Sequence, residues 1–459
     1  MLKELLLPEI HELIEQREWS LLREVLVTWS PAEIADLMLN VEKHERVLLY
    51  RALPQELAHE VFSYLEPDQQ VNLLRELTDS ETRQLLSALP PDDRTALLAE
   101  LPGHVTNRLL NLLDPEDLRE SRWLLGYPEE SVGRLMTPDF LALEPGWTVA
   151  HALEHIRQHG HDSETLNRLY VCDSRGRLLG VVRLRTLILS EPTAAIGELM
   201  EETPSLSAFD DQEEAVRMME KFDLSVLPVV DSNGILVGIV TFDDVFDVAE
   251  QEATEDIQKL GGMEALDISY RATPVGVLIR KRAGWLTALM LSEMLTTTAL
   301  TFFEKQIERA VVLVLFLPLV ISSGGNSGSQ AATLITRALA LQEITFRDWW
   351  FVLRRELASG LALGTILGTL GFFRIELWTL LFGPIYGSHH FLIALTVGLG
   401  LIGIVLWGTT IGAMLPLTLY RLGFDPATSS APFIATLVDV SGIVIYFVVA
   451  MLILGGTLL

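Results

Sequence analysis

Five long apolar segments near the carboxyl end of the chain constrain its fold more than any other feature. They lie near residues 284–303, 310–340, 356–382, 390–419 and 431–457. An α-helix needs about 20 apolar residues to cross a bilayer. It can do so because it satisfies its backbone hydrogen bonds within its own segment. Residues 271–459 are therefore predicted to form a transmembrane domain of five helices.

Basic residues at the ends of these segments orient the predicted helices. The side that also holds residues 1–270 receives Arg280, Lys281, Arg282, Arg337, Arg347, Arg354, Arg355 and Arg421. The other side receives Lys305, Arg309 and Arg374. Cytoplasmic loops carry the excess of Lys and Arg in membrane proteins. We therefore expect a multi-pass protein with cytoplasmic N-terminal domains and, because the number of spans is odd, an extracytoplasmic C-terminus.

Charge separates the two parts of the chain. Residues 1–270 hold 52 Asp and Glu against 22 Lys and Arg, a net charge of −30, whereas residues 271–459 carry +3. A region this acidic attracts cations and repels nucleic acid. Divalent cations and the lipid bilayer are the expected partners, and nucleic acid is not. The single cysteine, Cys172, rules out a disulfide framework and fits a reducing compartment.

A twelve-residue repeat marks residues 1–130. Leucine recurs at Leu53, Leu65, Leu77, Leu89, Leu101, Leu113 and Leu125. Most units open with Pro or an acidic residue, which suits a helix N-terminus. Twelve residues allow a helix of only about two turns, and such units must stack to bury their apolar faces. We predict an N-terminal helical superhelix, which serves either as a scaffold or as a regulatory arm whose acidic edges bind cations.

A different duplication follows at residues 131–198 and 199–250. "VCDSRGRLLGVV" at 171–182 resembles "VVDSNGILVGIV" at 229–240, and in each the two β-branched runs flank a turn. Such a pattern indicates a β-hairpin. With a helical segment before and after each hairpin, the two copies resemble a tandem pair of α/β CBS domains.

An acidic helix is predicted at residues 245–270, between the duplicated domains and the membrane. Asp247, Glu250, Glu252, Glu255 and Asp256 lie within three turns of it. Like charges at this spacing destabilise a helix unless something neutralises them. The cluster therefore indicates either a solvated helix face or a cation site.

Polar residues interrupt the predicted membrane helices at three places. Asp439 is the one charge between Ala431 and Leu454, and a charge at mid-membrane costs about 2.5–3.5 kcal/mol even on the lenient insertion scale. Glu293 is a second membrane acid. The run from Ser322 to Ala331 is nearly all small or polar, which fits an aqueous path or close helix packing. Close packing explains the glycines of this run but not Asn326.

The order of these parts resembles the MgtE family of bacterial magnesium channels. The resemblance covers essentially the whole chain and rests on "GGNSGSQAATLITRAL", "RLGFDPA", "ATLVDVSG" and, in the connecting helix, "EATEDI". It implies a multidomain fold of an N-terminal helical superhelix, tandem CBS domains, a connecting (plug) helix and five transmembrane helices. It also implies a homodimer in the inner membrane that takes up Mg²⁺ and is closed by cytoplasmic Mg²⁺.

The resemblance also assigns residues by position. Asp439 matches the selectivity aspartate, Ala435 the residue whose carbonyl faces the ion, and Asn326 the pore asparagine. Glu293 has no counterpart in the family pattern and is kept as a second cation contact. The predicted regulatory Mg²⁺ ligands are Asp92, Asp93, Glu213, Asp223, Asp244, Asp247, Glu252, Glu255 and Asp256.

The resemblance makes ATP a second expected ligand of the CBS pair. CBS domains that bind ATP usually end in Gly, two apolar residues, Ser or Thr, two residues and Asp. The second copy keeps this pattern with Thr241 and Asp244, whereas the first has Arg183 and Thr186 at those positions. ATP binding at the first copy is therefore expected to be weak or absent.

Other functional classes fit less well. The sequence shows no nucleophile–base pairing, zinc spacing or P-loop, so an enzyme is not expected. A proton- or sodium-coupled transporter of divalent cations, with Asp439 and Glu293 as coupling carboxylates, is the main alternative. A membrane-anchored nucleotide sensor without transport leaves the polar run at 322–331 unexplained.

Overall fold

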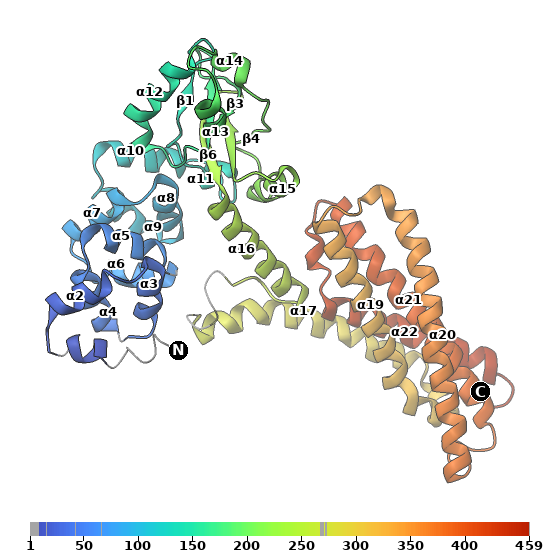
Figure 1. The fold of residues 1–459 in the computed structure, drawn as a ribbon. Helices are drawn as coiled ribbons and strands as arrows, with labels where there is room; N and C mark the ends of the chain where they lie inside the picture. Colours follow the sequence, from blue (N-terminus) through green and yellow to red (C-terminus); the bar gives the residue numbers. More distant parts are fainter. Residues whose placement is uncertain are drawn as a thin grey trace. The chain divides into compact units, whose positions relative to one another are not determined.

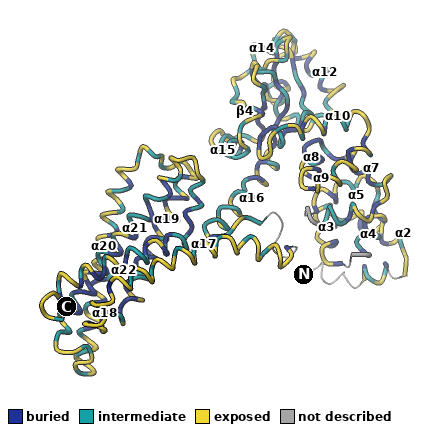
Figure 2. The backbone as a smooth tube through the Cα atoms, turned by 180° about the vertical axis from the view of Figure 1, so that it is seen from behind, coloured by how far each residue is buried: buried dark blue, intermediate teal, exposed yellow. Residues whose placement is uncertain are grey.

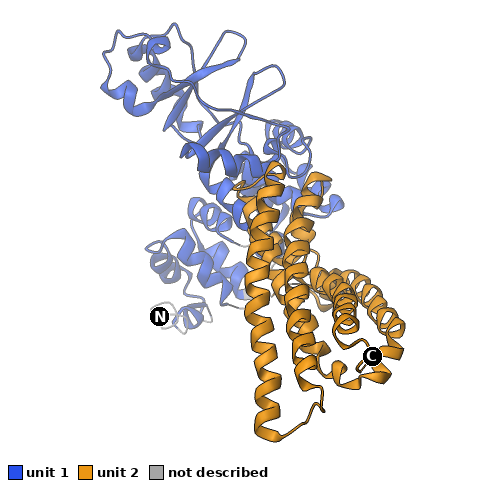
Figure 3. Ribbon diagram, turned by 90° about the vertical axis from the view of Figure 1, so that its right-hand side faces the viewer, with its two compact units in different colours: residues 1–252 blue, residues 253–459 orange. Residues whose placement is uncertain are grey.

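The computed structural model describes residues 9–14, 16–41, 43–65, 67–266, 270 and 273–458. The chain forms two compact units, residues 1–252 and residues 253–459 (Figure 3). Their boundary falls inside one continuous helix, α16 (Phe242–Leu260).

The N-terminal part of the first unit is a stack of short helices (Figure 1). They are α2 (Trp19–Leu26), α3 (Pro31–Leu39), α4 (Lys43–Ala52), α5 (Gln55–Ser63), α6 (Pro67–Leu74), α7 (Asp79–Ala88), α8 (Pro91–Glu100), α9 (Gly103–Leu110) and α10 (Pro115–Leu124). Six of the seven repeated leucines, from Leu53 to Leu113, are buried in one apolar core, and Leu125 packs against it. The predicted stack of two-turn units is confirmed for the described residues.

The two CBS copies have the same topology. The first contains β1 (Ala142–Leu143), α12 (Val149–His159), η1 (Gly160–Asp162), β2 (Arg168–Cys172), β3 (Leu178–Arg183) and α13 (Leu184–Leu189), and the second contains β4 (Leu206–Ser207), α15 (Gln212–Phe222), β5 (Val226–Val230) and β6 (Leu236–Thr241). In both sheets the first strand is parallel to the second, which pairs antiparallel with the third. Gly176 and Gly234 have φ near +78° and +77° in the hairpin turns, a conformation that favours glycine.

The first segment of each copy packs in the core of the other copy. α11 (Val132–Leu135) contributes Val132 to the core around β5 and β6, and α14 (Ile196–Leu199) contributes Ile196 to the core around β2 and β3. Backbone bridges such as Thr137 to Ile239 fix this exchange. The two cores therefore do not follow a linear division of the chain near residue 198.

The second unit is a bundle of long helices: α17 (Val275–Phe302), α18 (Glu304–Arg309), η2 (Val311–Phe316), α19 (Leu317–Ala340), η3 (Phe346–Asp348), α20 (Trp349–Phe382), α21 (His390–Arg421), η4 (Pro426–Thr428) and α22 (Ala431–Leu454). Four of the five predicted spans, those of α19 to α22, are long and apolar enough to cross a membrane. α17 has 28 residues but is less apolar, because Glu293 and several threonines interrupt it. None of its described residues is buried, and Figure 2 shows the contrast with the inner faces of α19, α21 and α22.

Glycines bring the backbones of these helices into contact. A Cβ atom at Gly328 would lie 2.9 Å from the carbonyl oxygen of Gly408, and one at Gly412 would overlap the carbonyl oxygen of Gly328. α19 and α21 therefore pack with no room for a side chain between them. On α20, Gly360, Gly364 and Gly368 face α21 in the same way, so these three glycines form a packing seam within the chain.

Gly412→Ala should destabilise the helical bundle by about 1–3 kcal/mol, because the added methyl group must displace backbone rather than a side chain. Gly276→Ala is the matched control, since a Cβ atom there meets nothing within 4 Å. Thermal unfolding of the full-length protein in detergent measures both. Equal unfolding temperatures for the two variants would contradict the packing described here.

Candidate functional site

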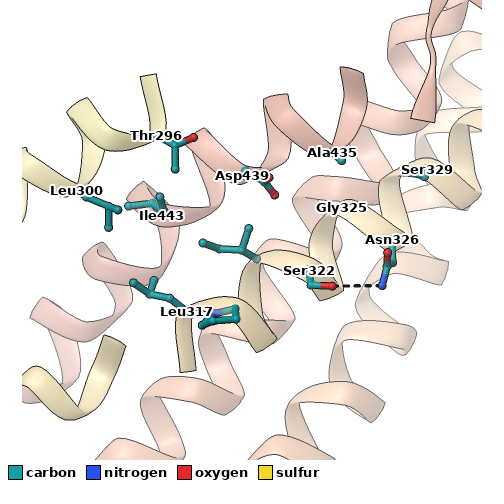
Figure 4. A pocket seen from close by; sticks show the side chains of 12 residues that line it. Thr296, Leu300, Leu317, Ser322, Gly325, Asn326, Ser329, Ala435, Asp439 and Ile443 are labelled. Atoms are coloured by element: carbon teal, nitrogen blue, oxygen red, sulfur yellow. Dashed lines mark hydrogen bonds between the residues drawn. The ribbon is translucent and has the colours of Figure 1, made fainter. Parts of the chain in front are cut away.

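A groove of about 420 Å³ opens between α17, α19 and α22. It is lined by Thr296, Leu300, Leu317, Pro318, Ile321, Ser322, Gly325, Asn326, Ser329, Ala435, Asp439 and Ile443. Three residues that the sequence assigned to the pore, Asn326, Ala435 and Asp439, are among them (Figure 4). The structure thus brings together side chains separated by more than 100 positions in the chain.

Asp439 is half-buried and lies one turn beyond Ala435 on α22. Gly325 of α19 faces both. A Cβ atom at Gly325 would lie 3.4 Å from Ala435 and 3.8 Å from the Asp439 carboxylate oxygen Oδ1. Glycine at this position keeps the space beside the carboxylate open.

Small polar groups of α19 form the rest of the polar lining. Asn326 is exposed, and its side-chain amide donates to the Ser322 hydroxyl at 3.5 Å (Figure 4). Ser329 donates to the carbonyl oxygen of Ala431 at 3.2 Å, which ties α19 to the start of α22. Glu293 does not line the groove, although Thr296, three residues later on α17, does.

The lining offers one carboxylate, one amide and a few hydroxyl oxygens. Dehydrated Mg²⁺ demands six oxygens in near-ideal octahedral geometry and sheds its water reluctantly. In the part of the chain that the structure describes, no three His, Cys, Asp or Glu side chains are arranged to hold a metal ion. The groove therefore suits a hydrated cation, held through its water molecules and by the charge of Asp439.

A second group of acids forms in the first unit, where α8 meets α16. We call it the acidic junction, and it consists of Asp92, Asp93, Glu164, Asp243, Asp244 and Asp247. Asp92 is only 7% exposed, Asp93 and Asp244 are half-buried, and the other three lie on the rim. The junction joins the N-terminal helices, the first CBS copy and the start of the connecting helix.

Burial and the charges of neighbouring acids raise the pKa of five members of the junction, Asp92, Asp93, Glu164, Asp244 and Asp247. Burial raises the pKa of Asp244 to about 7, although the Thr241 hydroxyl, which donates at 2.5 Å, opposes the shift, and Asp243, Asp93 and Glu164 raise it further. Burial and the Asp244 charge raise the pKa of Asp92 well above its ordinary value. Since each carboxylate makes it harder to ionise the next, a divalent cation here would relieve the repulsion.

Sequence reasoning identified four members of the junction and missed Glu164 and Asp243. Asp243 is adjacent to Asp244 in the "FDD" motif and could have been included. Glu164 lies in the loop after η1 and carries no sequence signal. Arg94, two residues after Asp92, is buried. Its side chain donates to Glu120 at 2.5 Å and to Ser121 at 3.1 Å, so its charge pairs with a residue of α10.

The remaining predicted Mg²⁺ ligands are not among the residues that define the acidic junction. Glu213 pairs with Arg217, and Asp223 ends α15 in a left-handed conformation. Glu252 accepts a hydrogen bond from Gln212 at 3.2 Å. In the second unit, Glu255 pairs with Lys259. Asp256 lies one residue further along α16. None of the raised pKa values of the junction depends on Glu213, Asp223 or Glu252, so these three acids of the first unit are not members of it.

A pocket with residues of both CBS copies is not lined by the predicted nucleotide residues. Thr241 bonds Asp244 in the acidic junction, whereas this pocket, of about 330 Å³, is lined by Leu178, Leu179, Gly180, Glu202, Thr203, Ser205, Val230 and Gly234. This lining holds one acid and no Lys or Arg, so it does not match the charge of ATP.

ATP should bind the first CBS copy of the full-length protein with a dissociation constant above about 1 mM, which corresponds to only about −4 kcal/mol, because Arg183 and Thr186 replace the expected Ser or Thr and Asp. Calorimetry on the purified protein measures this. Micromolar binding that Asp244→Asn abolishes would assign the ATP site to the second copy. Micromolar binding lost in Arg183→Ala would show that the first copy binds despite its altered motif.

Comparisons with known proteins agree with this arrangement. Residues 317–449 match a family described as "Divalent cation transporter", residues 29–130 match "MgtE intracellular N domain", and residues 132–190 and 196–250 match "CBS domain". The magnesium transporter MgtE of Thermus thermophilus is 41% identical over 99% of both chains. The chain belongs to the MgtE family. The MgtE of Bacillus subtilis is 32% identical over 71% of this chain and 70% of its own.

Two solved structures of magnesium-transporter fragments resemble about half of the chain. The cytosolic domain of the Mg²⁺ channel MgtE in complex with ATP has a TM-score of 0.51 and 36% identity, and covers 53% of this chain and 99% of its own. The soluble part of a magnesium transporter also has a TM-score of 0.51, with 27% identity over 55% of this chain and 99% of its own. As an MgtE protein, the chain is a membrane protein of a family of magnesium transporters rather than of enzymes.

Proposed function

We propose that this protein is a Mg²⁺-selective channel that takes up Mg²⁺ across the bacterial inner membrane. The observation that carries the proposal is the groove beside Asp439, where one carboxylate faces small polar residues and no closed metal site forms among the described residues. A channel must bind its ion well enough to admit it and weakly enough to release it. One carboxylate acting through water meets both needs.

We propose further that the functional unit is a homodimer. Ser322 and Asn326 lie one turn apart on α19 and are exposed, with Gln330 and Thr333 exposed further along the helix. Exposed polar residues at membrane depth are stable only against protein or water. A second copy of this chain, related by a two-fold axis, would enclose the groove and place two Asp439 carboxylates around the ion.

The same proposal assigns a sensing role to the acidic cytoplasmic part. At low cytoplasmic Mg²⁺ the acids of the junction repel one another. The described acids of the junction are not arranged to hold a metal ion in this structure. At higher Mg²⁺ the ion would draw them, and with them α8 and α16, together and favour the closed state. Mg²⁺ is then both the transported ion and the regulatory ligand. Its two sites, the pore and the acidic junction, are coupled through one element that has an open and a closed state.

A proton- or sodium-coupled transporter remains the second candidate function. It would use Glu293 with Asp439, and Glu293 does not line the groove. Mg²⁺ flux into liposomes that hold the pure protein separates the two mechanisms. We expect equal initial flux with and without proton and sodium gradients, whereas flux that collapses without a gradient would favour the coupled transporter.

Acidification should stabilise the first unit in the absence of Mg²⁺. The pKa of Asp244 is about 7 in the folded chain against an ordinary value of 3.8, because it is buried and faces the other carboxylates of α8, α16 and Glu164. The folded state therefore binds this proton more tightly, and the stabilisation is complete below the unfolded pKa and is lost as pH rises through 7. Between pH 8 and pH 6 the gain is about 1 kcal/mol.

Thermal unfolding of the full-length protein at pH 6 and pH 8 measures this, with an expected difference of about 2–4 °C. The matched variant Asp244→Asn should lose most of the response, because it cannot take up the proton. Millimolar Mg²⁺ should also reduce the response, since the ion favours the ionised carboxylates. A pH response that is unchanged in Asp244→Asn would show that other groups cause it.

A further inference from the structure

Lys259, near the end of α16, lies between two carboxylates of the second unit. Its ammonium nitrogen is 2.7 Å from Oδ2 of Asp425, and it also pairs with Glu255 one turn earlier on α16. All three side chains are about one-third exposed. The pair with Asp425 joins positions that are 166 residues apart.

Asp425 links this contact to the start of α22. Its other carboxylate oxygen, Oδ1, accepts from the backbone amide of Ala427 at 2.8 Å and so starts η4. Ser430 follows and caps α22 by accepting from the amide of Phe433 at 3.3 Å. Ala435 and Asp439 lie within the first turns of that helix. A short chain of hydrogen bonds therefore leads from Lys259 to the helix that carries the pore carboxylate.

A second contact fixes the same place. The indole of Trp285 donates to the Ser430 hydroxyl at 3.1 Å. Gly262, just after α16, has φ near +75°, and a Cβ atom there would lie 2.8 Å from the Trp285 ring and 3.2 Å from Pro432. The end of α16, the start of α17 and the start of α22 are therefore in van der Waals contact.

We propose that Lys259 is a positioning residue for transport: its ammonium is a built-in cation that clamps the connecting helix to the start of α22. This inference rests on the proposed Mg²⁺-dependent closure. The ammonium neutralises Glu255 and Asp425 at this contact, as Mg²⁺ neutralises acids in the junction. Glu255, which the sequence assigned as a Mg²⁺ ligand, then belongs to the clamp and serves to hold Lys259.

Removing the ammonium leaves no cation between the carboxylates of Glu255 and Asp425. Two carboxylates in one place repel, so the contact opens and the movement of α16 no longer reaches α22. The structure does not require the lysine itself, only a cation at this point. Arginine should therefore replace it, and exchanging the charges of residues 259 and 425 should restore the contact in part.

Mg²⁺ flux of full-length protein in liposomes, with internal Mg²⁺ varied, tests the clamp. Lys259→Gln should raise the internal Mg²⁺ that halves the flux by about tenfold, in line with the loss of one charge-assisted hydrogen bond. Lys259→Arg should stay near wild type. The double variant Lys259→Asp with Asp425→Lys should recover part of the loss that either single variant shows. The matched control is Lys221→Gln, an exposed lysine of α15.

Hydrogen exchange followed by mass spectrometry gives a readout that does not depend on closure by Mg²⁺. Lys259→Gln should speed exchange of the amides in residues 422–433, and Lys221→Gln should not. If neither the flux midpoint nor this exchange differs between the two variants, the clamp is refuted. If Mg²⁺ fails to inhibit the wild type, the proposed closure is refuted, and the exchange alone decides whether Lys259 holds the loop.

Discussion

Asp439→Ala abolishes Mg²⁺ uptake if the groove on α19 and α22 is the ion path. Asp439 is the one carboxylate of that groove, and its removal leaves only an amide and hydroxyl groups to attract a divalent ion. We expect a loss of at least about a hundredfold in flux, since even a partly screened charge at short range contributes several kcal/mol. The fold should survive, because Asp439 makes no ion pair with any residue that the structure describes.

The measurement is Mg²⁺ flux into liposomes, together with the thermal unfolding temperature of each variant. Asp439→Asn keeps the shape of the side chain and should lose most of the preference for divalent ions over monovalent ones. The matched control is Glu308→Gln, which removes an exposed acid of α18. Wild-type flux through a well-folded Asp439→Ala protein would place the ion path elsewhere.

The second large effect is expected at the acidic junction. Asp244→Asn combined with Asp247→Asn should leave the channel open at Mg²⁺ concentrations that close the wild type. If ions bridge opposing carboxylates, removing ligands should raise the Mg²⁺ needed for closure by tenfold or more, about 1.4 kcal/mol of coupling. If repulsion alone holds the channel open, the same variant should close at low Mg²⁺, because charge has been removed.

Two measurements distinguish these outcomes. Protease protection of the cytoplasmic part reports compaction, and liposome flux reports conduction. Glu220→Gln is the control, since this exposed acid of α15 is not a predicted Mg²⁺ ligand and none of the raised pKa values in the junction depends on it. If the double variant closes at low Mg²⁺, ions do not bridge these carboxylates, and repulsion between them alone holds the wild-type channel open.

Periodic features of the chain could be predicted from sequence. The leucine repeat predicted the helical stack, and the paired "DSRGR" and "DSNGI" turns predicted the two hairpins, because period and turn chemistry are local properties. The exchange of α11 and α14 between the CBS cores could not be predicted. Both copies present similar apolar residues there, and only tertiary packing decides which core each segment joins.

The candidate site shows the same division. Asp439 was conspicuous because a lone charge in an apolar run has few structural explanations. The place of Glu164 in the junction and the pairing of Lys259 with Asp425 could not be predicted from sequence, because they depend on which segments meet across long separations in the chain. Glu255, which was counted among the unneutralised acids of the helix, pairs with Lys259 four residues later on α16, and its role as a Mg²⁺ ligand stays a prediction.

Current recording from the pure protein in a planar bilayer tests the central claim most directly. With Mg²⁺ as the only permeant cation and no proton or sodium gradient, we predict unitary current steps when the side facing the acidic domains holds little Mg²⁺. Millimolar Mg²⁺ on that side should remove the steps, and Asp439→Ala should show none. Mg²⁺ uptake without unitary steps, or steps that Mg²⁺ on that side does not suppress, would contradict a Mg²⁺-gated channel.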